Sequence, residues 1–204
     1  SKQECLPMIT SCSPGWVRFA EKNYPDLLGH LSSCKSPHQM FGAMVKSYYA
    51  KKYNVDPKKI CMVSVMPCIA KKYECQREEM EVDGLRDVDY VITTRELSRM
   101  IKQANIEFTQ LQDDVFDEPM GEATGAGAIF GTTGGVMEAA LRTAVETMTK
   151  KPLDNIEFTE VRGIKGIKEA SYTVNGKEIK VAVVSGIKNA KDTLEKIKNK
   201  QVKY

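Results

Sequence analysis

This sequence of 204 residues lacks any long apolar run and any leader in which positive charge precedes a short apolar stretch. A helix that crosses a membrane needs about 18 consecutive apolar residues, so we expect no membrane partner, and nothing in the sequence indicates export. A large excess of one charge is also lacking, because 30 basic and 27 acidic residues give a net charge of +3. Lysines gather in the tail but alternate with acidic and apolar residues, which is typical of a solvated helix face. We therefore expect no nucleic-acid partner.

Histidine is scarce, and the cysteines lack the usual metal and disulfide spacings. Only His30 and His38 are present, and neither lies in a sequence context typical of a protease, so no Ser–His–acid set is indicated. The six cysteines form no Cys-x-x-Cys pair, which argues against a zinc ribbon or a ferredoxin-type cluster run. They also show no framework spacing, so free thiols in a reducing cytoplasm are the better interpretation.

A glycine-rich stretch over residues 125–135 lacks the Gly-Lys-Ser/Thr that would complete a phosphate loop. Nucleotide binding is therefore only weakly indicated. Glycines at this density favour a backbone that passes close to a compact cofactor or a neighbouring helix.

Short apolar segments alternate along the chain with amphipathic helical patterns, which predicts an α/β fold. Continuous apolar segments predict strands buried on both faces, and an Asn-Gly pair predicts a two-residue hairpin turn. A soft boundary divides the chain into lobes of residues 1–115 and 116–204. The predicted elements are helices that begin at Pro14 and Pro37, strands over 60–66 and 89–93, a helix from Arg95 capped by Thr94, a helix over 136–149, a strand over 156–162, a hairpin over 171–184 and a helix over 190–200.

Two cysteine segments, whose central cysteines Cys12 and Cys68 are 56 positions apart, are the most informative part of the sequence. The first cysteine segment, residues 10–16, is TSCSPGW, and the second, residues 66–74, is MPCIAKKYE. Thiolates suit iron–sulfur chemistry, and Lys71 can turn its ammonium toward an anionic ligand in the same pocket. From spacing alone, Cys12 could be a nucleophile, a metal ligand or a small buried residue. Glu74 by itself is interpreted as a surface charge that pairs with Lys72 or with a first-turn amide.

These segments, together with others in the same order, resemble the catalytic domain of the [FeFe]-hydrogenases over essentially the whole chain. The matching segments include residues 31–37 (LSSCKSP), 91–97 (VITTREL), 125–142 and 161–169. The resemblance implies two α/β lobes, each around a small, largely parallel sheet, with a cofactor in the cleft between them. It also implies an oxidoreductase that reversibly reduces protons to hydrogen at an H-cluster, a [4Fe–4S] cubane joined to a two-iron unit. Ferredoxin or NAD(P)H-linked redox subunits are the implied electron partners.

The resemblance assigns roles to individual residues. Cys12 corresponds to a thiol that relays protons, and Ser32 to a hydroxyl on the same proton path. Cys68 corresponds to a ligand of the cubane. Lys71 corresponds to an ammonium that binds a cyanide of the two-iron unit, where a charge-assisted bond is strong. The implied pocket-wall residues are Ser36, Pro37, Met66 and Phe130.

Three departures from the family pattern weaken the implied site. Ser13 stands at the position of another cubane ligand, where a hydroxyl is a poorer iron ligand than a thiolate, so Cys12 could ligate iron instead of relaying protons. His38 replaces the common glutamine, which would change a hydrogen bond to a diatomic ligand. The last two cubane cysteines would follow Tyr204, so we expect a fragment that is inactive alone and that depends on the remainder of a hydrogenase chain. The alternative interpretation is a hydrogenase-like sensor or a non-catalytic iron–sulfur or structural module.

Overall fold

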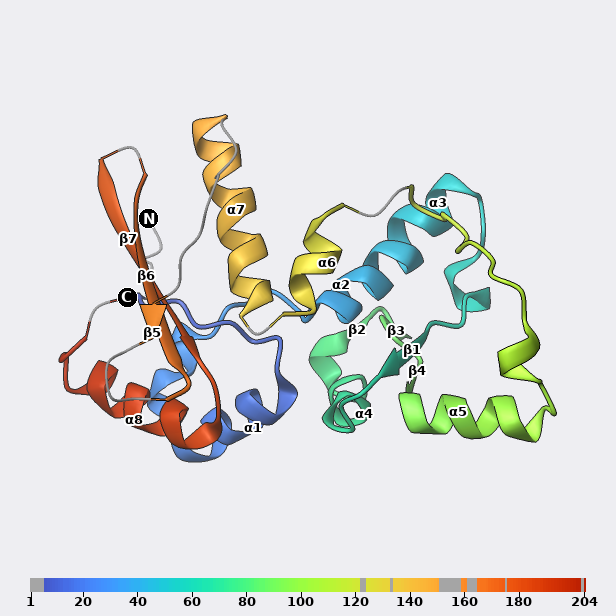
Figure 1. Ribbon diagram of the computed structural model, residues 1–204, viewed down its shortest axis with the longest axis horizontal. Helices are drawn as coiled ribbons and strands as arrows, with labels where there is room; N and C mark the ends of the chain where they lie inside the picture. The colour runs from blue at the N-terminus through green and yellow to red at the C-terminus, as the bar shows by residue number, and fades with distance from the viewer. Residues whose placement is uncertain are drawn as a thin grey trace. The chain divides into compact units, whose positions relative to one another are not determined.

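The structure is a computed structural model that describes residues 6–121, 124–132, 134–150, 159–160, 165–174, 176–202 and 204 (Figure 1). The chain divides into two compact units. The amino-terminal unit comprises Met8–Gly121. The carboxyl-terminal unit contains the described residues from 124 onward, together with Leu6 and Pro7. None of the helices in the described residues has both the length and the apolar character that crossing a membrane requires.

The amino-terminal unit combines short helices with a two-stranded parallel sheet. Proline occupies the first turn of its first two helices, where the missing N–H has no helical partner in any case. Its helices are α1 (Pro14–Asn23), α2 (Pro37–Met44), α3 (Ala50–Lys52), α4 (Ala70–Glu74) and α5 (Thr94–Gln103), and its strands are β1 (Val63–Met66), β2 (Glu81–Val82), β3 (Leu85–Arg86) and β4 (Tyr90–Thr93). A π-helical turn, Val45–Tyr49, joins α2 to α3.

Strands β1 and β4 run parallel, in a register that pairs Val63 with Tyr90 and Met66 with Thr93. Both strands therefore end at the same edge, where the chain enters α4 and α5. The start of α5 is closed by a capping box in which the Thr93 hydroxyl accepts from Glu96 N and Glu96 accepts from Thr93 N. The cap is therefore Thr93, one residue before the predicted Thr94. In open sheets this carboxyl edge is where ligands commonly bind.

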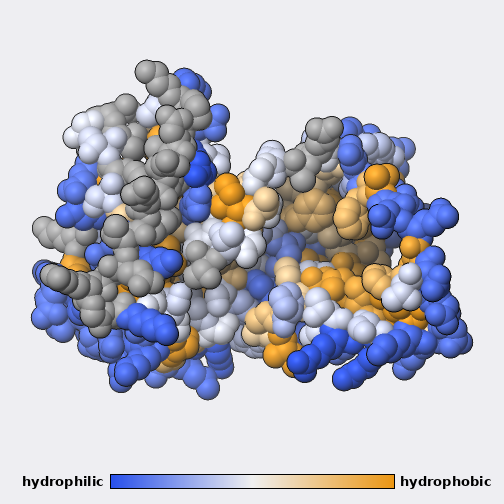
Figure 2. Space-filling view, viewed as in Figure 1, coloured by the Kyte–Doolittle hydropathy of each residue, from blue (hydrophilic) through white to orange (hydrophobic). Residues whose placement is uncertain are grey.

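The sequence pattern had predicted that both strands are buried on both faces, and this prediction is wrong. Val63 is 49% exposed and Tyr90 is 63% exposed. Helices α4 and α5 pack on the strand pair without covering both of its faces. A small core still forms from Cys75, Val88 and Val91, with Met66 packed against it. Figure 2 shows apolar residues gathered beside α5 on the visible face.

The carboxyl-terminal unit has an antiparallel sheet in its described residues, where the resemblance had implied a largely parallel one. The pairing confirms the predicted hairpin: Ile167 pairs with Val184 and Val174 with Lys177. The turn includes Gly176 at φ 78°, a conformation that glycine adopts without strain. Its elements are α6 (Ala126–Phe130), α7 (Gly135–Thr149), β5 (Thr159–Glu160), β6 (Ile167–Val174), β7 (Lys177–Val184) and α8 (Ile187–Lys198).

The core of this unit joins α7 to the hairpin, because Leu141 and Val145 are buried with Ile179 and Val181 packed against them. The predicted strand over 156–162 falls mostly outside the described residues, apart from β5. The α/β class is confirmed. The lobe boundary at residues 115 and 116 and the cofactor cleft between lobes stay predictions.

Candidate functional site

The first cysteine segment is held in place by residues that follow α1. Ser32 N donates to Ile9 O at 2.7 Å, within an isolated parallel bridge between Ile9 and Leu31. The Ser11 hydroxyl lies 2.9 Å from the carbonyl oxygen of Ser32 and 2.7 Å from that of Cys34. The backbone around the first thiol is therefore anchored before α1 begins.

The second cysteine segment lies at the carboxyl edge of the parallel sheet. Strand β1 ends at Met66, and Pro67 and Cys68 lead into α4. The Lys71 N–H donates to Cys68 O at 3.2 Å, which begins the helical turn. This turn directs the Lys71 side chain toward the backbone of the first cysteine segment.

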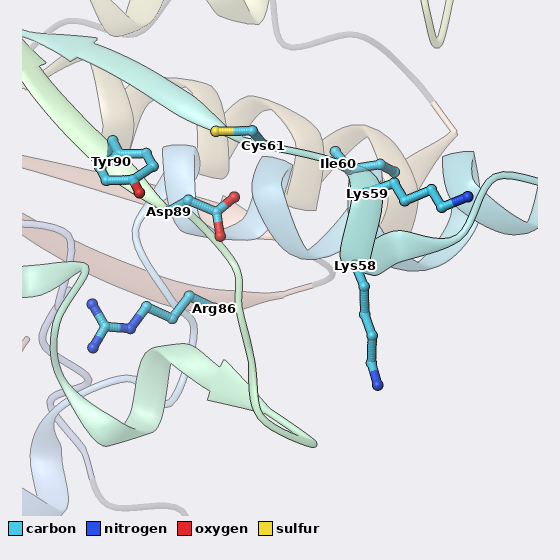
Figure 3. Close-up of a pocket in the computed structure, with 7 residues that line it drawn as sticks. All are labelled: Lys58, Lys59, Ile60, Cys61, Arg86, Asp89 and Tyr90. Atoms are coloured by element: carbon cyan, nitrogen blue, oxygen red, sulfur yellow. The ribbon is translucent and has the colours of Figure 1, made fainter.

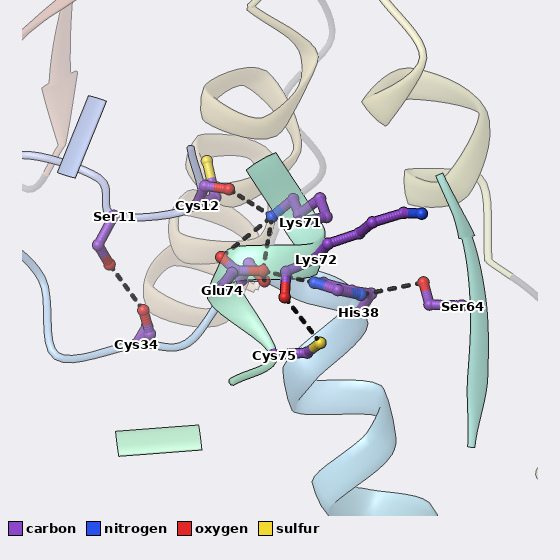
Figure 4. Close-up of polar contacts among 10 residues, drawn as sticks. Ser11, Cys12, Cys34, His38, Ser64, Lys71, Lys72, Glu74 and Cys75 are labelled. Atoms are coloured by element: carbon purple, nitrogen blue, oxygen red, sulfur yellow. Dashed lines mark hydrogen bonds and ion pairs between the residues drawn. The ribbon is translucent and has the colours of Figure 1, made fainter. Parts of the chain in front are cut away.

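Lys71 forms a buried ion pair with Glu74 and connects the two cysteine segments through a hydrogen bond to the backbone of Cys12 (Figure 4). Its ammonium donates to Glu74 Oε1 at 3.1 Å, to Glu74 Oε2 at 3.0 Å and to the carbonyl oxygen of Cys12 at 2.8 Å. Lys71 is 9% exposed and Glu74 only 2% exposed. Charges at this depth are tolerated only when they are paired and hydrogen-bonded, so these contacts determine where the cation lies.

Glu74 is the centre of the cluster. Besides Lys71, its Oε2 accepts from the hydroxyl of Ser36 at 2.9 Å and contacts His38 Nε2 at 2.5 Å. Burial opposes ionisation of Glu74, but hydrogen bonds from His38 and Lys71 outweigh it and hold the pKa of the carboxyl below its ordinary value. The opposite ring nitrogen of His38, Nδ1, lies 3.0 Å from Ser64 Oγ on β1. We call Cys12, Ser36, His38, Ser64, Lys71 and Glu74 the Glu74 network.

The structure brings together four of the residues that the sequence singled out, namely Cys12, Ser36, His38 and Lys71. Cys12 is half-buried and contributes its backbone carbonyl oxygen to the Glu74 network. Pro37 begins α2 between two members of the network.

The other predicted residues make no side-chain contact with Glu74 that the structure records. Cys68 is exposed, and Ser13 is an exposed helix cap whose side chain makes no capping bond. The Ser32 hydroxyl accepts from Cys34 N at 3.2 Å. Met66 packs on the core, and Phe130, on α6 of the other unit, is 41% exposed. No distance or contact tests the roles assigned to these residues, which stay predictions.

Sequence reasoning missed Glu74, whose interpretation as a surface charge is wrong. Lys72 pairs instead with Glu96, at 2.6 Å. The signal was the spacing of Lys71 and Glu74, since residues three apart on a helix are neighbours. Gln39 was missed too: it is fully buried, and neither of its amide atoms has a hydrogen-bond partner in the part of the chain that the structure describes.

Within the described residues, the donor set does not complete an iron–sulfur site. Cysteine thiols suit such a cluster, and Cys12 and Cys68 are the thiols of the two cysteine segments. A cubane, however, takes four ligands. Across the described residues, no three His, Cys, Asp or Glu side chains converge as metal ligands.

A separate hollow of about 420 Å³ lies where β1 and β4 begin (Figure 3). Its charged lining is mostly basic, from Lys58, Lys59 and Arg86, while Asp89 is paired with Lys46 at 2.7 Å. Its lining includes no member of the Glu74 network and no residue that the sequence singled out. This hollow is therefore distinct from the candidate site.

Comparison with known proteins connects this geometry to a family. The model of the iron-only hydrogenase large subunit, C-terminal domain, matches residues 1–204. Iron hydrogenase 1 of Clostridium pasteurianum is 56% identical over 184 residues, which are 90% of this chain and 32% of that protein. The periplasmic Fe hydrogenase large subunit of Nitratidesulfovibrio vulgaris is 53% identical over 193 residues, 95% of this chain and 46% of that protein.

Solved structures and more distant relatives agree with this match over the length of the chain. A variant of the apo [FeFe]-hydrogenase of Chlamydomonas reinhardtii superimposes with a TM-score of 0.83 and 44% identity, covering 98% of this chain and 58% of that one. The cytosolic Fe–S cluster assembly factor narfl of Xenopus tropicalis is 33% identical over 216 residues, 99% of this chain and 44% of that protein. The chain thus spans less than half of each of these curated relatives. Since this family model matches residues 1–204, the chain belongs to the family of the iron-only hydrogenase large subunit, C-terminal domain.

Proposed function

We propose that this chain is part of an iron-only hydrogenase that reversibly reduces protons to hydrogen at an H-cluster. The observation that carries the proposal is the family match over residues 1–204. It is supported by the buried cation of Lys71, held within 2.8 Å of the first cysteine segment. When bound, the cluster supplies the redox chemistry, and the protein holds, orients and shields it.

Within this proposal, each residue has a distinct task. Cys68 follows the carboxyl edge of the sheet and would be an iron ligand. Lys71 keeps a positive charge in a buried place, where it can bind an anionic group of the cofactor. Cys12 would move protons with the help of Ser32, or would ligate iron because Ser13 is a weak ligand. Ser36, Pro37, Met66 and Phe130 would line the pocket.

The test is anaerobic loading of the purified hydrogenase chain that contains this domain with iron, sulfide and a synthetic two-iron cofactor. Hydrogen evolution from reduced methyl viologen, iron content and infrared bands of carbon monoxide and cyanide are then measured. In Cys68→Ala, we expect hydrogen evolution to fall to below about one hundredth, because removal of a ligand costs more than removal of an outer-sphere partner.

Cys61→Ala is the matched control, since Cys61 is also an exposed thiol and lies seven residues earlier. Its hydrogen evolution should equal that of the unmodified protein. Unchanged iron content and unchanged infrared bands in Cys68→Ala would remove Cys68 from the site.

A second candidate function is a hydrogenase-like module without hydrogenase activity, such as a sensor or an iron–sulfur structural module. Two observations favour it: a serine, Ser13, stands where the resemblance implies a cysteine ligand, and relatives at about one-third identity are named as cluster assembly factors. Ser13→Cys separates the two functions. A gain in bound iron and in hydrogen evolution supports the enzyme, whereas bound iron without hydrogen evolution in either form supports the module.

For electron partners, we propose ferredoxin or an NAD(P)H-linked redox subunit, together with the remainder of the hydrogenase chain. Hydrogen evolution driven by reduced ferredoxin, compared with evolution driven by NADPH and its reductase, distinguishes the two donors. We also propose a cytoplasmic location. One of the relatives above is named as periplasmic, so cell fractionation is needed to test this location.

A further inference from the structure

His38 has both of its ring nitrogens engaged by the protein. Nε2 lies 2.5 Å from Glu74 Oε2, Nδ1 lies 3.0 Å from Ser64 Oγ, and its side chain is 8% exposed. The hydrogen bond to a diatomic ligand that His38 was expected to change stays a prediction. The contacts of His38 point to a role within the protein.

The charges define which nitrogen carries the proton. Glu74 has a lowered pKa, so it is a carboxylate that only accepts hydrogen bonds. His38 Nε2 must therefore donate to it. Nδ1 lies 3.0 Å from the Ser64 hydroxyl, which can either donate or accept a hydrogen bond. The proton on Nε2 is therefore required by Glu74, and Ser64 holds the ring from its opposite side.

The network joins separate segments of the amino-terminal unit through one carboxylate. His38 and Ser36 come from the start of α2, Ser64 from β1, and Lys71 and Glu74 from α4. Because Glu74 Oε2 receives contacts from three side chains, its position is defined from several directions. The position of Lys71 follows, since the ammonium is held between Glu74 and the Cys12 carbonyl.

We propose that His38 is a positioning residue: its Nε2–H fixes the carboxylate of Glu74, and Glu74 in turn holds the Lys71 ammonium against the first cysteine segment. Ser64 orients the ring for this task. The inference rests on the proposed function only in treating Lys71 as the cation that binds the cofactor. The placement of that cation by His38 is a property of the protein without any cluster.

The first test is the tautomer of His38, measured by nitrogen-15 NMR of the purified protein. The sequence has only two histidines, so His30→Gln leaves a single imidazole signal to assign. We expect Nε2 to carry a proton. The Nδ1–H form would overturn the proposal, because Nε2 could then give nothing to Glu74. This measurement needs no change at His38 itself.

The second test is the reactivity of Lys71 toward acetic anhydride, measured by peptide mass spectrometry. His38→Gln places an amide near the position of Nε2 and keeps the bond to Glu74, whereas His38→Asn reaches only the position of Nδ1. We expect Lys71 to be acetylated about tenfold faster in His38→Asn, the factor that corresponds to one charge-assisted hydrogen bond, and at the original rate in His38→Gln.

Lys72 is the internal control, since it pairs with Glu96 and should react equally in all variants. Equal acetylation rates of Lys71 in all three proteins would overturn the proposal. So would an original rate in His38→Asn together with a faster rate in His38→Gln. Both measurements are made without a cluster, so their failure is distinct from a failure of hydrogen evolution. Hydrogen evolution could be absent from a protein in which His38 still positions Lys71.

Discussion

Lys71 and Lys72 are adjacent on α4, yet they occupy opposite environments. Lys71 is 9% exposed and shares Glu74 with Ser36 and His38. Lys72 forms a pair with Glu96 in which both side chains are more than one-third exposed. Both pairs have short contacts, so distance alone would rank them alike. Burial makes the difference, because a buried charge that loses its partner cannot be rescued by water.

The strongest way to break this comparison is to remove the acid from each pair. Glu74→Gln leaves the Lys71 ammonium buried and unpaired, so we expect a loss of about 3–5 kcal/mol in the free energy of unfolding. Glu96→Gln leaves Lys72 in contact with water and should cost clearly less. Urea denaturation of both variants measures the difference. Equal losses would mean that the depth of Glu74 has no energetic consequence.

A smaller effect separates the two tasks of Glu96, which binds Lys72 and closes the capping box of α5. Thr93→Ala removes the hydroxyl that accepts from Glu96 N, and we expect a loss of about 1 kcal/mol in unfolding free energy. Ser98→Ala, an exposed serine in the same helix, is the control and should cost little. If both variants unfold at the same urea concentration, the capping box contributes nothing to stability.

Acid should weaken both pairs in the same direction. The hydrogen bond from Lys72 and the cap at Thr93 lower the pKa of Glu96 from 4.5 to about 2, and the pKa of Glu74 is also lowered. A carboxyl with a lowered pKa stabilises the fold above its ordinary pKa, and this contribution is lost as the pH falls through the lowered value. Stability should therefore decrease from pH 4.5 toward pH 2.

The stability of the Glu96→Gln variant should decrease less over this acid range, because the variant has no carboxyl to protonate at that site. Thermal unfolding of both proteins at a series of pH values measures the slope. Parallel slopes would show that Glu96 is not responsible for the acid sensitivity.

The smallest effect is the response to salt. Salt screens exposed charges and has little effect on buried ones. Raising sodium chloride should change the acetylation rate of Lys72 by no more than about twofold and leave that of Lys71 constant. A larger response from Lys71 than from Lys72 would contradict the burial of its pair.

Features that depend on local sequence were predicted well. The helices that begin at Pro14 and Pro37, the strand segments of β1 and β4 and the hairpin of β6 and β7 all appear in the structure. The cap of α5 was wrong by one residue, because adjacent threonines at 93 and 94 look equivalent without their backbone geometry. The largely parallel sheet that the resemblance implied for the carboxyl-terminal unit does not appear in its described residues, where β5 also pairs antiparallel with β6, a direction that no local pattern indicates.

By itself, the sequence determined the α/β class, most of the elements and the two cysteine segments, because periodicity, turn residues and motif spacing are local properties. Only the tertiary structure decided that Glu74 is buried, that it binds Lys71 and not Lys72, and that His38 contacts Glu74 and Ser64. Residues 38, 64 and 74 come from α2, β1 and α4, and no local pattern reports how such elements pack. Burial then turns an ordinary Lys–Glu spacing into the fixed charge of the candidate site.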